Sequence, residues 1–202
     1  MGGIIPKIAF GSLAIKSPGG VDIPVIVRLT LTSPSEDDID YFLTAHALDG
    51  STVIINKDPD FPRIIGILAS GPTTAPVTIR GLDIRGFPIT ETVNLEGAGI
   101  APSIKAYSRI VSVDLPTVAA TTVRIGTTNG TFGLPFRMTT FGALVETRDG
   151  ENQGNINGIT LGSTEAGQDY YGTWSPGASP DGSSSFTLLF VPTGFEAAGV
   201  DN

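Results

Sequence analysis

One stretch of alternating residues, 77–95, constrains the fold of this chain more than any other feature. Two runs of β-branched and apolar residues flank a tight reversal at residues 83–86 (DIRG), which is the arrangement of a β-hairpin. In the second run Ile89, Val93 and Leu95 fall on one face, while threonine, asparagine and glutamate fall on the other. This period of two predicts a half-buried strand and, with it, an all-β fold.

The composition fits the same fold class. Among 202 residues there are 26 glycines and 15 prolines, and only 16% of the residues are charged. Many short strands joined by tight turns have such a composition, and the length suits one large domain. We therefore expect an antiparallel β-sandwich or barrel with an extended N-terminal arm. The absence of cysteine excludes disulfide bonds and thiolate metal sites.

The charge excludes one class of function. A net charge of −8 argues against direct binding to nucleic acid, because neutralising phosphates needs clustered lysine and arginine. No run of residues approaches the roughly 18 apolar residues of a membrane span, and the N-terminal residues lack the continuous apolar block of a secretory signal. We expect a soluble protein, made in the cytoplasm, that binds neither nucleic acid nor membrane.

The extended N-terminal arm is predicted from the composition of residues 1–24. They mix large apolar side chains with glycines and prolines, which neither a helix nor a disordered segment explains. Such an arm would lie on its own domain or on a neighbour, and the sequence leaves both open. We divide the chain into this arm (1–24), a β-sandwich core (25–147) and loop-rich hairpins (148–202) whose last strand completes the core or contacts another subunit. The arm residues expected to bind a partner are Ile4, Ile5, Ile8, Phe10, Leu13 and Ile15.

The last expected strand, 185–192, is apolar on both faces. Phe186, Leu188 and Phe190 lie on one side, and Leu189 and Val191 lie on the other. Either the strand is central in a sheet or a partner covers its second face. We therefore add Leu189 and Val191 to the candidate partner-binding residues.

Other segments also alternate like strands. We expect a strand at 63–70 with both faces covered, and a turn or short helix start at 33–38. The Asp49-Gly50 and Asn129-Gly130 pairs predict hairpin turns. The remaining expected strands are 23–31, 53–56, 103–115, 122–127 and 141–147.

Residues that could carry chemistry are few. The single histidine, His46, lies in an apolar segment, where a structural role is the usual one. Asp83 and Glu91 could serve as a glycosidase pair, but a sugar site also needs aromatic platforms. Aromatic residues cluster only at 170–174, in Tyr170, Tyr171 and Trp174, where packing or a subunit contact is the simpler role.

Four carboxylates occur between Glu36 and Asp40, but their spacing matches no EF-hand loop. A solvated acidic turn is therefore favoured over a calcium site. We predict no catalytic residues, no cofactor and no metal.

Five segments share a further pattern: VTIRGLDIRG (77–86), ITETV (89–93), IVSVDL (110–115), TVRIGT (122–127) and GLPFR (133–137). Together they resemble a family of tailed-bacteriophage virion proteins, and the resemblance covers about residues 63–137. Proteins of this family have small β-domains on the capsid surface or in the tail, and those of the capsid often act as decoration, or cement, proteins. The resemblance brings no catalytic residues with it.

The resemblance implies a non-enzymatic protein on the head surface of a virion. Its partners would be the major capsid protein and further copies of itself, as a dimer or trimer. Two alternatives remain: a tail, collar or baseplate component, and a carbohydrate-binding β-sandwich module that uses Trp174 and the neighbouring tyrosines.

Overall fold

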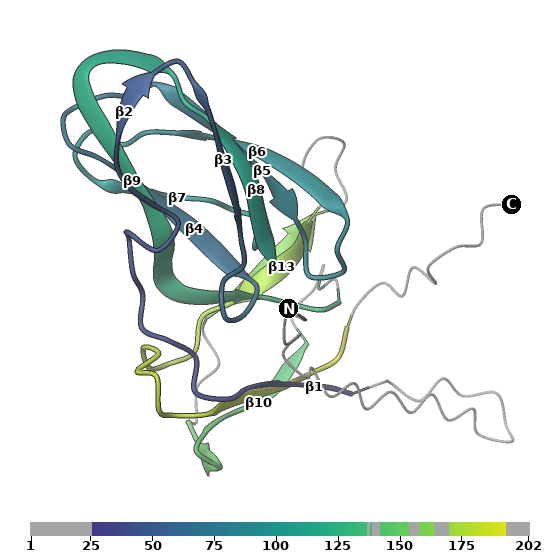
Figure 1. Ribbon diagram of the computed structural model, residues 1–202. Helices are drawn as coiled ribbons and strands as arrows, with labels where there is room; N and C mark the ends of the chain where they lie inside the picture. The colour runs from purple at the N-terminus through teal and green to yellow at the C-terminus, as the bar shows by residue number, and fades with distance from the viewer. Residues whose placement is uncertain (1–25, 137, 139–141, 154–157, 164–169, 193–202) are drawn as a thin grey trace, which may run out of the picture.

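The computed structural model describes residues 26–136, 138, 142–153, 158–163 and 170–192 (Figure 1). Within these ranges the chain forms strands, turns and loops without a helix, which confirms the all-β prediction. Accordingly, the described part of the chain offers no helix able to cross a membrane. The strands are β1 (Val27–Leu31), β2 (Leu43–Asp49), β3 (Thr52–Lys57), β4 (Arg63–Ala69), β5 (Pro76–Leu82), β6 (Pro88–Asn94), β7 (Ile100–Pro102), β8 (Arg109–Asp114), β9 (Thr117–Gly133), β10 (Ala143–Arg148), β11 (Glu151–Asn152), β12 (Ile159–Ser163), β13 (Tyr170–Trp174) and β14 (Phe186–Phe190).

The described strands form three antiparallel sheets. One has the order β3-β8-β5-β6, and the second has the order β12-β13-β9-β4-β7 with β2 also paired to β9. These two sheets face each other in the upper part of Figure 1, as in a β-sandwich. The third sheet, β1-β14-β10-β11, lies below them.

The first hydrophobic core lies between the first two of these sheets. Ile65 and Ile67 of β4 and Val77 and Ile79 of β5 belong to it, and none of them has exposed surface. The pattern follows from the period of two within each strand, which sends alternate side chains inward. As expected, β4 is a central strand with both faces covered, because it lies between β9 and β7 and also buries Ile64.

The second core lies against the third sheet, β1-β14-β10-β11, which we call the small sheet. Both ends of the described chain contribute to it, because β1 pairs with β14, which also pairs with β10. Trp174 and Phe132 fill this core from the neighbouring sheet, and each fully buried apolar side chain contributes about 1.5–3 kcal/mol. The strand residues that close it are Val27, Leu29 and Leu31 of β1 with Phe186, Leu188 and Phe190 of β14.

The two cores are joined by β9, a strand of 17 residues. The hairpin turn predicted at Asn129-Gly130 is wrong, because β9 continues through this pair. Both residues have positive φ angles, 58° and 51°, and the pairing with β4 shifts from Ile65↔Thr127 to Arg63↔Phe132. The pair therefore forms a β-bulge that bends β9 from the first core toward the second.

Three further expectations need correction. The Asp49-Gly50 turn does not close a hairpin, because β2 pairs with β9 and β3 pairs with β8 in the opposite sheet. The strand expected at 103–115 begins at Arg109, since the preceding residues form a loop after β7. Of the turn or short helix start expected at 33–38, the helix is absent, and the chain has a bend at Ser33 and a turn at residues 39–40.

Candidate functional site

On the side opposite the second core, the small sheet carries apolar residues beside the polar Arg28, Thr30 and Thr187. We call this side the outer face, and its apolar residues are Ile26, Leu144, Val145, Leu189 and Val191. Leu189 pairs with Val145 on β10, and both are partly exposed. Ile26 is 49% exposed and Leu144, the extra residue of a bulge in β10, is 48% exposed. Apolar side chains at this level of exposure lose contact with water when a partner covers them.

Two of the eight candidate partner-binding residues therefore lie together on this face. β14 is central in its sheet, and Leu189 and Val191 still keep a partly exposed side. The other six candidates, Ile4, Ile5, Ile8, Phe10, Leu13 and Ile15, lie outside the described residues. Sequence reasoning missed Ile26, although it is an apolar residue on the face of β1 that carries Arg28 and Thr30.

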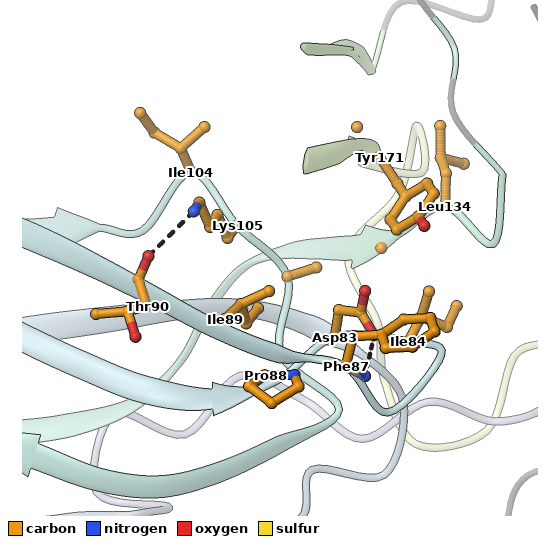
Figure 2. Close-up of a pocket in the computed structure, with 13 residues that line it drawn as sticks. Asp83, Ile84, Phe87, Pro88, Ile89, Thr90, Ile104, Lys105, Leu134 and Tyr171 are labelled. Carbon is orange, nitrogen blue, oxygen red and sulfur yellow. Dashed lines mark hydrogen bonds between the residues drawn. The ribbon is translucent and has the colours of Figure 1, made fainter. Parts of the chain in front are cut away.

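The structure also contains a pocket of about 480 Å³ that the sequence did not indicate (Figure 2). Four separate parts of the chain line it: the β5–β6 hairpin, the loop before β8, the segment at Leu134 and the segment at Tyr171. In Figure 2, Thr90, Ile104 and Lys105 lie at one end, and Leu134 and Tyr171 lie at the other. Phe87 and Ile104 are 59% and 57% exposed.

The carboxylates beside the pocket hold the loops in place. Asp83 Oδ1 accepts hydrogen bonds from the backbone N–H groups of Arg85 and Phe87, both at 2.8 Å. Glu91 accepts from the N–H groups of Ile104 and Lys105 at 2.7 and 3.0 Å. Burial raises the pKa of Glu91, and these amide donors oppose the shift. The pair considered for glycosidase chemistry thus shapes the turn and the loop that form the pocket.

One wall of the pocket is held by a stacked arginine. The guanidinium carbon of Arg85 lies 4.8 Å from the ring centroid of Tyr171 and 5.7 Å from that of Phe136. This cation–π contact ties the β5–β6 turn to the elements of the second core.

Two carboxylates of the acidic turn at 36–40 pair with arginine side chains. Asp40 accepts hydrogen bonds from Arg124, which lowers the pKa of that carboxyl group. Asp37 lies 3.7 Å from the guanidinium of the buried Arg63 and accepts a bond from the N–H of Gly130. Across the described ranges, no group of three or more acidic, histidine or cysteine residues is placed to hold a metal ion.

Trp174 and His46 are part of the folded framework and do not form a binding site. Trp174 has no exposed surface, and its indole N–H donates to the buried Glu146 at 3.1 Å. A sugar ring therefore cannot stack on Trp174. His46 lies in β2 and pairs with Val123 of β9.

No family model matches this chain, and neither a curated protein nor a solved structure matches it. The function must therefore be argued from the geometry of the outer face and of the pocket.

Proposed function

We propose that this chain is a capsid decoration protein of a tailed bacteriophage, a non-enzymatic β protein that binds the head shell and stabilises it. The observation that carries the proposal is the outer face. The side chains of β14 that point inward fill the second core, whereas Leu189 and Val191 on its other side keep exposed apolar area. Together with the apolar sequence of residues 1–24, they provide surface for burial between molecules.

Stabilisation of a shell follows from mass action. A protein that binds the assembled shell, and not its separated subunits, shifts the equilibrium toward the assembled state. Each copy needs only a modest contact, because many copies act on one shell. The proposed partners are the major capsid protein and neighbouring copies of this chain.

The test compares two isoleucines that differ in position and not in chemistry. Ile26 lies on the outer face at 49% exposed, and Ile54 lies on β3 at 65% exposed. Ile26→Asp should weaken binding to heads assembled without this protein by about tenfold or more, because it places charge in an apolar contact. Co-sedimentation with the heads measures this affinity.

The matched control is Ile54→Asp, which should bind the heads as the unaltered chain does. Equal binding by all variants would remove the outer face from the proposal. Absence of binding by the unaltered chain to any head preparation would remove the decoration role itself. The position of the gene offers a separate test, since a decoration gene is expected beside that of the major capsid protein.

A tail, collar or baseplate component is the second candidate. The observation that favours it is the position of β1 at the end of its sheet among the described strands, because an edge strand can pair with a strand of another copy. Rings or tubes formed by the isolated protein in electron micrographs would support this role over the decoration role. The carbohydrate-binding alternative loses its main platform, because Trp174 is buried.

A further inference from the structure

The bulge in β9 contains an Asn-Gly pair, Asn129-Gly130, a sequence that is prone to deamidation. Because glycine has no side chain, its backbone nitrogen can reach the side chain of the asparagine before it. In this reaction the nitrogen of Gly130 bonds to Asn129 Cγ, the Cγ–Nδ2 bond breaks, and ammonia leaves with the proton that the nitrogen gives up. Water then opens the succinimide ring to aspartate or isoaspartate. The side chain of Asn129 is exposed, so water can reach it.

The attacking nitrogen is held by Asp37. The N–H of Gly130 donates a hydrogen bond to Asp37 Oδ2 at 2.7 Å, a length typical of bonds to a charged acceptor. The other carboxylate oxygen, Oδ1, lies 3.7 Å from Arg63 Nη1. The next residue also docks on β9, because Thr127 N–H donates to Asp38 O and Asp38 N–H donates to Thr127 Oγ1, both at 2.9 Å. The carboxylate of Asp37 is therefore fixed against the bulge.

This hydrogen bond opposes the reaction in two ways. The N–H of Gly130 must leave Asp37 before the nitrogen can turn toward Asn129 Cγ, so a bond to a charged group has to break. The nitrogen must also give up its proton, and the negative charge that results is disfavoured beside a carboxylate. Gly130 is buried as well, and a Cβ atom there would lie 2.6 Å from Pro180 Cδ, so the backbone has little room to turn.

We propose that Asp37 protects Asn129 from deamidation, so that this Asn-Gly pair persists in the folded protein. The position matters because isoaspartate adds one carbon atom to the backbone. β9 pairs with β4 both before and after the Asn-Gly pair, and it contributes side chains to both hydrophobic cores. An added backbone atom would therefore change the register of β9 at the junction of the cores. The inference stands whether or not the chain binds a phage head.

The experiment follows deamidation of the folded full chain at neutral pH by digestion with trypsin and mass spectrometry. Cleavage after Arg124 and Arg137 gives a peptide in which Asn129 is the one asparagine or glutamine, so a gain in mass from amide to acid reports this residue alone. The chain unfolded in guanidinium chloride gives the unprotected rate. The folded chain should react about tenfold more slowly or less, and equal rates would overturn the proposal.

Two alanine variants test the role assigned to Asp37. Asp37→Ala should raise the rate at Asn129 in the folded chain by about tenfold, the effect of losing one hydrogen bond to a charged group. The matched control is Asp60→Ala, which also takes a carboxylate from Arg63 but leaves the bond from Gly130 N–H in place. The rate in this control should stay close to that of the unaltered chain.

A third variant keeps the test decisive if Asp37→Ala does not fold. In Asp37→Asn the amide oxygen can still accept from Gly130 N–H but carries no charge, so the rate should lie between those of the unaltered chain and Asp37→Ala. An unchanged or lower rate in the Asp37 variants would overturn the proposal, and a lower rate would identify Asp37 as a base that takes the proton. Equal acceleration by Asp37→Ala and Asp60→Ala would also overturn it, because the pairing of Arg63 would then be the cause.

Discussion

Arg63 contacts residues of both hydrophobic cores. It is 1% exposed, lies 4.6 Å from the ring centroid of Phe132 in the second core, and exchanges backbone hydrogen bonds with Tyr107 of the first core. Its guanidinium contacts Asp37 and Asp60. Burial lowers the pKa of Arg63, and the two carboxylates offset this effect. Such a buried charge is tolerated only while its partners remain in place.

We expect Arg63→Ala to lower the free energy of unfolding by about 2–5 kcal/mol, since it removes a fully buried side chain packed on Phe132 and leaves a cavity. The matched control is Arg80→Ala, which removes an arginine that is 49% exposed and pairs with Asp114. That change should cost about 0–1 kcal/mol. Urea unfolding measures both, and equal losses would contradict a special role for the buried arginine.

At the scale of elements, local patterns predicted strands better than they predicted partners. The β5–β6 hairpin is correct because its alternation and its turn lie within one short segment. The Asn129-Gly130 and Asp49-Gly50 pairs carry the same turn signal, yet one became a bulge and the other a link between sheets. The pairing partner of a strand depends on which side chains become buried across the whole molecule, and a local sequence pattern does not contain this information.

The same limit applies to the candidate site. Leu189 and Val191 could be predicted because they disturb the alternation of a single strand. Leu144 and Val145 come to the outer face only through the pairing of β10 with β14. The pocket combines residues 83–90, 104–106, 133–134 and 171–172, and no sequence pattern connects these segments.

The bulge in β9 makes a prediction at this scale. A Cβ atom at Gly130 would lie 2.6 Å from Pro180 Cδ, and the φ of this residue is 51°. Gly86 also has a positive φ, 84°, but a Cβ there would meet nothing within 4 Å. Gly86→Ala should therefore cost about 1–2 kcal/mol from backbone strain alone, and Gly130→Ala should cost more.

Thermal or urea unfolding of the two variants checks this difference. A smaller loss for Gly130→Ala than for Gly86→Ala would mean that β9 does not need the close contact with Pro180. The bend between the two cores would then have another cause.

For the whole molecule, ion pairs between strands and loops link stability to pH. Arg109 donates to Asp58, and Arg124 donates to Asp40, which lowers the pKa of both carboxyl groups. Backbone amides of Ser183 and Ser184 lower the pKa of Asp181 in the same direction. A carboxyl group whose pKa is lower in the folded state than in the unfolded chain stabilises the fold at pH values above the unfolded pKa.

The stability contributed by these groups should thus be complete above about pH 5 and should decline as the pH falls through the unfolded and then the folded pKa values. Glu91 works in the opposite direction, because burial raises its pKa and protonation relieves an unfavourable buried charge. The lowered groups are more numerous among the described carboxylates, so we expect a net loss of stability toward low pH. Unfolding curves between about pH 7 and pH 3 measure it.

Asp181→Asn should flatten this acid-side decline, since it removes one of the groups that must take up a proton. Concentrated salt should reduce the part of the decline that comes from the exposed arginine–aspartate pairs, because salt screens them. The part that comes from hydrogen bonds between Asp181 and backbone amides should remain. A profile that is identical with and without Asp181 would contradict the assignment.

The second core has a consequence for the order of events during synthesis. Its sheet brings β1, near residue 30, beside β14, near residue 190, so the sheet cannot close until almost the entire described chain has left the ribosome. The outer face lies on this same sheet. A nascent chain would therefore lack the proposed binding surface until the final step of its own folding.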